Sequence, residues 1–210
     1  WSCSIETILK FPVTSFVRFF DNHGLLNVVN QPQWYTVSGG SREYVRKIEQ
    51  NLKGVIRKNT AVQSVERKSG IWCIRDDNGA ETQADHVVFA CHADEALAML
   101  SNPDPAIAET LSSFTYQENR IIAHSDESFM PQNRKAWASW VYLSEDRDDQ
   151  NSSVSLTYWM NNLQNIPNET PLFVTLNPAQ PPRAGTLHYS ESYDHPILDA
   201  KAIAGQRKLW

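Results

Sequence analysis

The sequence predicts a mixed α/β fold of the α+β type, and three patterns along its 210 residues predict it. Apolar residues recur at helical spacing in the N-terminal part, as on the buried faces of helices. A helix, a tight β-meander, an apolar run and a second helix follow between Val37 and Leu100, an order typical of an α/β unit. Alternating strands with polar turns fill the C-terminal half, which is typical of an antiparallel sheet. We therefore expect three regions, 1–34, 35–105 and 106–210.

The first region is expected to be helical. Ser4 is a suitable N-cap for a short helix that ends near Leu9. Pro12 suits the first turn of a second helix, which Gly24 ends, and a short strand from Leu25 to Val29 follows. The second helix has one apolar face at i, i+3, i+4 and i+7 spacing, formed by Val13, Phe16, Val17 and Phe20.

The second region begins with a tight turn from Ser38 to Ser41, which leads into a helix. The buried face of that helix is predicted to consist of Tyr44, Val45, Ile48 and Leu52. Three short strands follow, over residues 61–66, 71–75 and 81–83. Asn78 and Gly79 predict a hairpin turn between the last two strands, with positive φ at both central positions.

A continuous apolar run from His86 to Ala90 predicts a strand that is buried on both faces. A helix from Glu95 to Leu100 follows it, with acidic residues near its start.

The third region opens with a short helix and continues as five strands and a last helix. The strands are expected at Tyr116–His124, Ala136–Leu143, Val154–Trp159, Leu172–Leu176 and Gly185–Tyr193, with the helix at Asp199–Leu209. Aromatic residues gather on two of these strands, and they are Trp137, Trp140, Tyr142, Tyr158 and Trp159. Such side chains either stabilise a sheet by cross-strand packing or line a ligand cavity, and both interpretations stay open.

The composition limits the function classes. Hydrophobic residues make up 41%, charged residues 20% and the formal net charge is -5, which suits a globular, ordered protein. Lys and Arg are dispersed, so we expect no nucleic-acid partner. No apolar run approaches the length of a transmembrane helix, and the three cysteines predict a reducing, cytoplasmic environment. Because the chain starts at Trp1 and ends within a helical pattern, we expect an internal piece of a longer polypeptide.

Motifs for independent chemistry are few. None of the eight glycines has the GxGxxG spacing that cradles a pyrophosphate, so the chain alone is not expected to bind a dinucleotide tightly. The histidines lack metal-ligand spacing, and we expect no metal site. Cys91 follows the predicted buried strand, where the start of a helix lowers a thiol pKa, so a reactive nucleophile competes with a merely structural cysteine.

Several segments together resemble flavin-containing amine oxidases and their relatives, the protoporphyrinogen oxidases and carotenoid desaturases. The broader resemblance rests on residues 35–41, on 61–65 and Gly79, and on 84–90. Residues 1–4, 16–25, 136–140 and 157–161 resemble a bacterial branch of predicted NAD/FAD-binding, amine-oxidase-like proteins.

The resemblance implies that the parent protein is an FAD-dependent oxidoreductase that moves hydride from a small or apolar substrate to the flavin. It implies that residues 35–105 form the second half of the FAD-binding domain, with the glycine fingerprint outside this chain. Val62 would contact the adenine end of FAD through its backbone, and Ala90 and Cys91 would end a strand of that domain. The antiparallel part resembles the substrate-domain sheet that covers the flavin, so its five aromatic residues are candidates for the substrate cavity. No residue has a catalytic assignment.

Two alternatives remain. The first is a non-enzymatic binding module, in which the aromatic sheet holds an apolar ligand or a protein partner. The second is a thiol hydrolase that uses Cys91. If the chain is a fragment, it is expected to be inactive by itself and to form homo-oligomers through the surfaces that truncation exposes.

Overall fold

The structure, a computed structural model, describes residues 5–143 and 155–209. These residues divide into two compact units. Unit 1 consists of Trp1–Asn51 and Tyr116–Ile197, and unit 2 of Leu52–Thr115 and Leu198–Trp210. The predicted mixed α/β class is confirmed, with helices beside two separate sheets. None of the helices among the described residues is long and apolar enough to cross a membrane.

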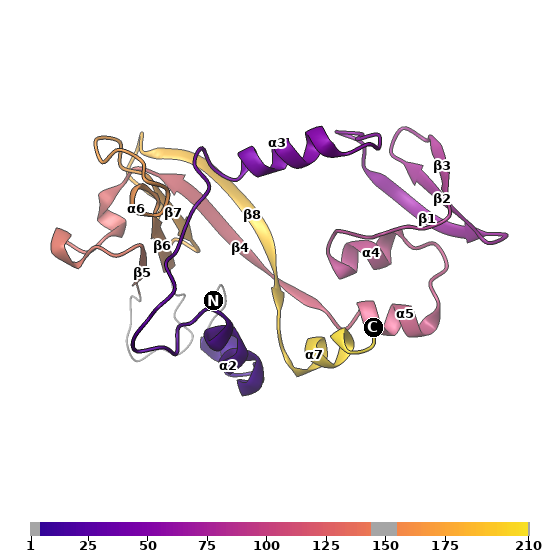
Figure 1. The fold of residues 1–210 in the computed structure, drawn as a ribbon, viewed down its shortest axis with the longest axis horizontal. Coiled ribbons are helices and arrows are strands. Elements are labelled where there is room, and N and C mark those ends of the chain that lie inside the picture. The colour runs from indigo at the N-terminus through magenta and orange to yellow at the C-terminus, as the bar shows by residue number, and fades with distance from the viewer. Residues whose placement is uncertain (1–4, 144–154, 210) are drawn as a thin grey trace. The chain divides into compact units, whose positions relative to one another are not determined.

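Unit 1 contains a five-stranded sheet with the order β5-β6-β7-β4-β8 (Figure 1). Its strands are β4 (Thr115–His124), β5 (Trp140–Leu143), β6 (Ser155–Trp159), β7 (Phe173–Leu176) and β8 (Leu187–Ile197). The β5–β6, β6–β7 and β4–β7 pairs are antiparallel, which confirms the predicted antiparallel sheet. Val154, the predicted first residue of β6, lies outside the described residues.

The hydrophobic core of unit 1 lies on one face of this sheet. Phe173 is fully buried there, together with Met130 and Val141. Trp137, Leu143 and Trp159 pack around these three side chains. Residues 125–139, which connect β4 to β5, thus supply part of the cover over the sheet.

The helices of unit 1 form where the apolar spacing predicts them, but their apolar faces are not buried. They are α1 (Ile5–Ile8), α2 (Val13–Asn22), α3 (Arg42–Asn51) and α6 (Met160–Gln164), with the short 3-10 turns η1 (Glu127–Phe129) and η2 (Arg134–Ala136). Neither α2 nor α3 has a buried residue among the described side chains. The predicted burial of Tyr44, Val45, Ile48 and Leu52 is therefore wrong, because a helix face is buried only when another layer packs on it.

Two further predictions fall in the N-terminal part. Leu25 to Val29 forms turns and bends rather than the predicted strand, since these residues pair with no strand in the described part of the chain. The predicted N-cap Ser4 lies outside the described residues. Gly24 follows α2 with φ of 64°, as expected of a residue that ends a helix.

Unit 2 contains the predicted β-meander, in which β2 lies between β1 and β3 (Figure 1). Its elements are β1 (Val62–Lys68), β2 (Ile71–Asp76), β3 (Glu81–Ala84), α4 (Ala93–Met99), α5 (Pro105–Leu111) and α7 (Ala200–Gln206). Both strand pairs are antiparallel. The sheet is thus held by contacts between segments adjacent in the sequence.

The two hairpin turns differ from the prediction. Ser69 and Gly70 both have positive φ, 50° and 89°, which is the signature of a type I′ turn. In the next hairpin only Gly79 has positive φ, so the expectation for Asn78 is wrong. There the Asp76 carboxylate accepts hydrogen bonds from the backbone N–H of Asn78 at 3.0 Å and of Ala80 at 2.9 Å. These bonds stabilise a three-residue loop instead of a two-residue one.

His86 to Ala90 does not form the predicted buried strand. The segment has no strand partner among the described residues, and Val88 is 88% exposed. A strand that is buried on both faces requires a neighbour at each edge, and its own apolar sequence cannot supply them. The prediction is therefore wrong for this chain, although α4 follows the segment as expected.

Helix α4 packs against β1. His92 is its N-cap and shares a capping box with Glu95, whose carboxylate accepts from the His92 N–H at 3.0 Å. At the other end of the helix, Leu100 forms a parallel bridge with Val65, and the Ser101 N–H donates to the Val65 carbonyl at 3.1 Å. Val65 is consequently buried.

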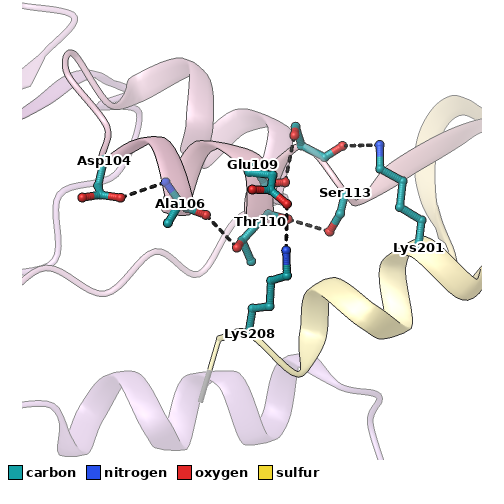
Figure 2. A network of polar contacts seen from close by, with 8 residues as sticks. Asp104, Ala106, Glu109, Thr110, Ser113, Lys201 and Lys208 are labelled. Carbon is teal, nitrogen blue, oxygen red and sulfur yellow. Dashed lines mark hydrogen bonds and ion pairs between the residues drawn. The ribbon is translucent and has the colours of Figure 1, made fainter.

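Helices α5 and α7 meet in a polar and closely packed contact (Figure 2). Lys208 Nζ lies 2.7 Å from Glu109 Oε1, and Lys201 Nζ donates to the Ser112 carbonyl at 3.4 Å. Between these contacts, a methyl group on Gly205 would overlap the Ser113 hydroxyl and lie 3.0 Å from Ser113 Cβ. The absence of a side chain at Gly205 thus permits the approach of the two helices.

Candidate functional site

The first candidate cofactor residue, Val62, begins the edge strand of the meander. Val62 is paired with Asp76, and the Asp77 N–H donates to the Ala61 carbonyl at 2.8 Å beside this pair. That bond makes Val62–Asp76 a non-hydrogen-bonded pair, in which the peptide groups of Val62 point away from the partner strand. Since β1 has a neighbour on one side only, the N–H and C=O of Val62 face the outer edge of the sheet.

This outer edge is closed at one position and open at another. At Val65 it is covered by Leu100 and Ser101, as described above. At Val62 no backbone hydrogen bond covers it within residues 5–143 and 155–209, and the side chain is 40% exposed. The backbone N–H donor and C=O acceptor of Val62 are therefore presented together on this edge. This is the arrangement that the polar edge of an adenine ring requires, so the residues present fit this part of FAD.

Ala90 and Cys91 belong to the same unit as Val62 and lie immediately before α4. Both are exposed. Partial burial of the thiol, followed by the charges of Glu95 and Asp94, raises the pKa of Cys91. The expectation of a lowered pKa is thus wrong, because desolvation of the thiol and then the acidic side chains in the first turn of α4 oppose thiolate formation. The hypothesis of a Cys91 nucleophile loses its support.

The five aromatic candidates separate into two groups. Trp137 is not on a strand, because Asn133 caps η2 and turns the preceding residues out of the extended conformation. The indole N–H of Trp137 donates to the Pro131 carbonyl at 2.9 Å. Its ring meets that of Trp159 edge to face, with centroids 5.2 Å apart, and lies 5.8 Å from that of Phe173. Trp137 and Trp159 therefore pack in the core.

The other three residues lie on the opposite face of the sheet and are named here the aromatic strip: Trp140, Tyr142 and Tyr158. Trp140 is directly opposite Tyr158 on the neighbouring strand, and Tyr142 is two residues along β5. Trp140 is 49% and Tyr142 58% exposed, whereas partial burial raises the pKa of the Tyr158 phenol. The aromatic strip is a surface on which a flat or apolar group can pack.

A buried polar network on the core face was not predicted from the sequence. His124 Nε2 lies 2.7 Å from Thr175 Oγ1, which lies 2.8 Å from Thr157 Oγ1. The backbone N–H of Asp126 donates to His124 Nδ1 at 3.2 Å. Nδ1 is thus an acceptor, and the ring proton is on Nε2, from which it is donated to Thr175. The side chains of His124, Thr157 and Thr175 are all fully buried.

Ionisation in this network is strongly perturbed. Burial, which disfavours the imidazolium, lowers the pKa of His124 to about 4, so the ring is neutral. Burial alone would raise the pKa of Asp126, but hydrogen bonds from Arg183 and Ser128 lower it to about 2. The Arg183 backbone N–H donates to Asp126 Oδ2 at 2.7 Å, and its side chain to Oδ1 at 2.9 Å. A neutral histidine thus lies beside a permanently charged carboxylate.

Within residues 5–143 and 155–209, no three His, Cys, Asp or Glu side chains are grouped so that they could hold a metal ion. The cofactor candidates lie in unit 2 and the aromatic candidates in unit 1.

Several solved structures have a similar fold. A CLA-producing fatty acid isomerase from P. acnes aligns with a TM-score of 0.52 and 13% identity, covering 80% of this chain and 43% of its own. Reduced UDP-galactopyranose mutase aligns with a TM-score of 0.52 and 13% identity, and the alignment covers 81% of this chain and 43% of the mutase. A provisionally named protoporphyrinogen oxidase from Exiguobacterium sp. 255-15 aligns with a TM-score of 0.59 and 11% identity. The alignment covers 93% of this chain and 49% of the oxidase.

At these identities the similarity is one of fold, and this chain spans less than half the length of each of the three structures. A search among curated proteins gives no match. The sequence model for flavin-containing amine oxidoreductases, by contrast, matches residues 11–179, which is most of the chain and includes both candidate regions. The chain therefore belongs to the flavin-containing amine oxidoreductase family.

Proposed function

We propose that this chain forms part of an FAD-dependent oxidoreductase, in which hydride leaves a small or apolar substrate and is accepted by the flavin. The observation that carries the proposal is the open strand edge at Val62, in a chain that matches the family over residues 11–179. FAD, when bound, supplies the hydride acceptor. The chain's own residues bind the cofactor and the substrate and orient them. The proposed site of action is the cytoplasm.

Val62 holds the adenine end of the cofactor in this proposal. Its outward-facing N–H and C=O would supply a donor and an acceptor for the polar edge of adenine, so the contact would depend on the backbone and tolerate any small apolar side chain. Ala90 and Cys91, at the end of the segment that precedes α4 in the same unit, would be the further residues that hold the cofactor. The raised pKa of Cys91 is compatible with this role, because a neutral thiol adds no charge near the dinucleotide.

The aromatic strip receives the substrate. Trp140 and Tyr142 present ring surface that excludes water and packs on an apolar group, which favours hydride transfer over side reactions with solvent. Trp137 and Trp159 were candidates for the same role, but their contacts in the core support a structural one.

The test uses the longer parent polypeptide, purified after addition of FAD, with Val62→Pro and Val62→Ala variants. Proline removes the outward-facing N–H without removing a ladder hydrogen bond, and the first residue of an edge strand tolerates it. We expect Val62→Pro to weaken FAD binding about tenfold, the effect of one hydrogen bond, while Val62→Ala retains it. Circular dichroism checks that both variants are folded.

Two results would overturn the proposal. One is a parent protein that shows no flavin absorbance after purification with excess FAD. The other is a Val62→Pro variant that is folded and binds FAD as tightly as the original. For the substrate role, Trp140→Ala is expected to raise KM more than it changes kcat, because the strip binds substrate before and during the reaction alike.

The exposure of the aromatic strip also supports a second candidate, a non-enzymatic binding module for an apolar ligand or a protein partner. In that case the 210-residue chain itself would bind an apolar ligand, Trp140→Ala would abolish binding, and FAD would have no effect.

A further inference from the structure

An open groove in unit 1, with a mixed polar and apolar lining, lies outside the residues considered so far. It is formed by the end of α2 and the segment that follows it up to Tyr35, and its volume is about 520 Å³. This volume is within the range of about 300–1,000 Å³ that is typical of small-molecule sites. The residues that carry the argument are Asp21, His23, Asn27, Gln33, Trp34 and Tyr35, and we name the site the His23 groove.

The floor of the His23 groove is held in a defined shape. Gly24 has φ of 64°, and a Cβ at this position would lie 2.7 Å from Pro32 Cδ, so the returning segment approaches the helix end as closely as glycine permits. The His23 ring lies between the ring of Phe19, at 4.1 Å, and that of Trp34, at 6.3 Å and nearly parallel. The backbone thus brings the indole to the groove.

His23 has a fixed tautomer. Its Nδ1 lies 2.7 Å from the Phe19 carbonyl, which can only accept, so Nδ1 carries the proton. Nε2 of the neutral ring is then an acceptor. The imidazole therefore offers Nε2 as its hydrogen-bond acceptor, and the roles of the two ring nitrogens are not interchangeable.

The lining identifies the chemical class of the ligand. No Lys or Arg side chain lines the groove in the described part of the chain, so its chemistry does not suit a phosphate or another anion. The carboxamides of Asn27 and Gln33 both donate and accept, and the Asp21 carboxylate accepts twice, as neighbouring hydroxyl groups require. Trp34 is 57% exposed and Tyr35 89%, which leaves ring surface available for the C–H face of a saturated ring.

We propose that the His23 groove binds a neutral sugar. Hydroxyl groups of the sugar would exchange hydrogen bonds with Asp21, Asn27 and the Nε2 of His23, while its apolar face packs on Trp34. This binding is separate from the flavin-dependent activity proposed above and does not depend on it.

The experiment measures saturation-transfer NMR on the 210-residue chain with D-glucose, D-galactose and N-acetyl-D-glucosamine, followed by titration of the sugar with the strongest signal. Uridine and inorganic phosphate serve as ligands of other classes. The variants are Trp34→Ala, Asp21→Asn and, as a matched control, Tyr44→Ala, whose aromatic ring is similarly exposed in the same unit.

We expect at least one sugar to bind, with affinity about tenfold lower in Trp34→Ala, reduced in Asp21→Asn and unchanged in Tyr44→Ala. Asp21→Asn is a surface change and keeps the test valid if Trp34→Ala does not fold. The proposal is overturned if no sugar gives a signal, if only uridine or phosphate binds, or if Tyr44→Ala weakens binding as much as Trp34→Ala.

Discussion

The buried His124 predicts a specific dependence of stability on pH. In the folded chain its pKa is about 4, whereas the ordinary value is 6.5. Between these values the unfolded chain binds more protons than the folded one, so stability falls as the pH decreases from 6.5 towards 4. Of the titratable groups near His124, Asp126 raises its pKa and His188 lowers it, and both effects are smaller than that of burial.

The magnitude follows from the two pKa values. Lowering the pH from 7.5 to 5 is expected to cost about 2 kcal/mol of unfolding free energy through this one group. The assay is urea denaturation followed by tryptophan fluorescence. Trp137 is a suitable reporter, because its ring contacts Phe173, which in turn contacts His124. Linear extrapolation of each unfolding curve to zero urea gives the free energy of unfolding at that pH.

The control is a pair of variants. His124→Gln removes the titrating group and is expected to have a lower free energy of unfolding at pH 7.5. Between pH 7.5 and 5, that free energy is expected to fall by about 2 kcal/mol less than in the original chain. His195→Gln, at an exposed histidine, is expected to keep the original pH dependence. If His124→Gln and the original chain show the same dependence between pH 7.5 and 5, the reasoning from burial is refuted.

Three further predictions concern packing, charge and association. Gly205→Ala is expected to destabilise unit 2 by about 1–3 kcal/mol in thermal unfolding, and adding Ser113→Ala is expected to restore part of this stability. The control Gly54→Ala, where a Cβ would meet no neighbouring atom, is expected to stay within about 1 kcal/mol of the original stability. Asp126→Asn is expected to cost about 2 kcal/mol at pH 7, an effect absent below pH 2. The exposed apolar faces of α2 and α3 predict concentration-dependent dimers in light scattering, and a monomer at high concentration would contradict this.

Local signals predicted the elements of this fold well. The β-meander of unit 2 was predictable because its strands are adjacent in sequence and turn residues separate them. The turn type at Asp77 to Gly79 was not, because the deciding hydrogen bonds come from Asp76, whose side chain had no role in the pattern. A dipeptide preference thus gave the position of the turn but not its geometry.

Predictions that depended on distant neighbours succeeded less well. The apolar run at His86 to Ala90 reads as a buried strand, yet a strand forms only beside another strand. Similarly, period-two alternation put Trp140 and Tyr142 on one face but could not tell which face would be covered. The same ambiguity concealed His124, Thr157 and Thr175, because polar residues on a strand are ordinarily expected to face solvent.

The division into two units has a consequence for how the chain is made. The polypeptide crosses between the units after Asn51, Thr115 and Ile197, so neither unit is one continuous segment. During synthesis, the meander of unit 2 emerges early, but α7, which packs on α5, emerges only after all of unit 1. The contact at Gly205 is therefore the last part of unit 2 to form, and a substitution there acts on the final step in the folding of that unit.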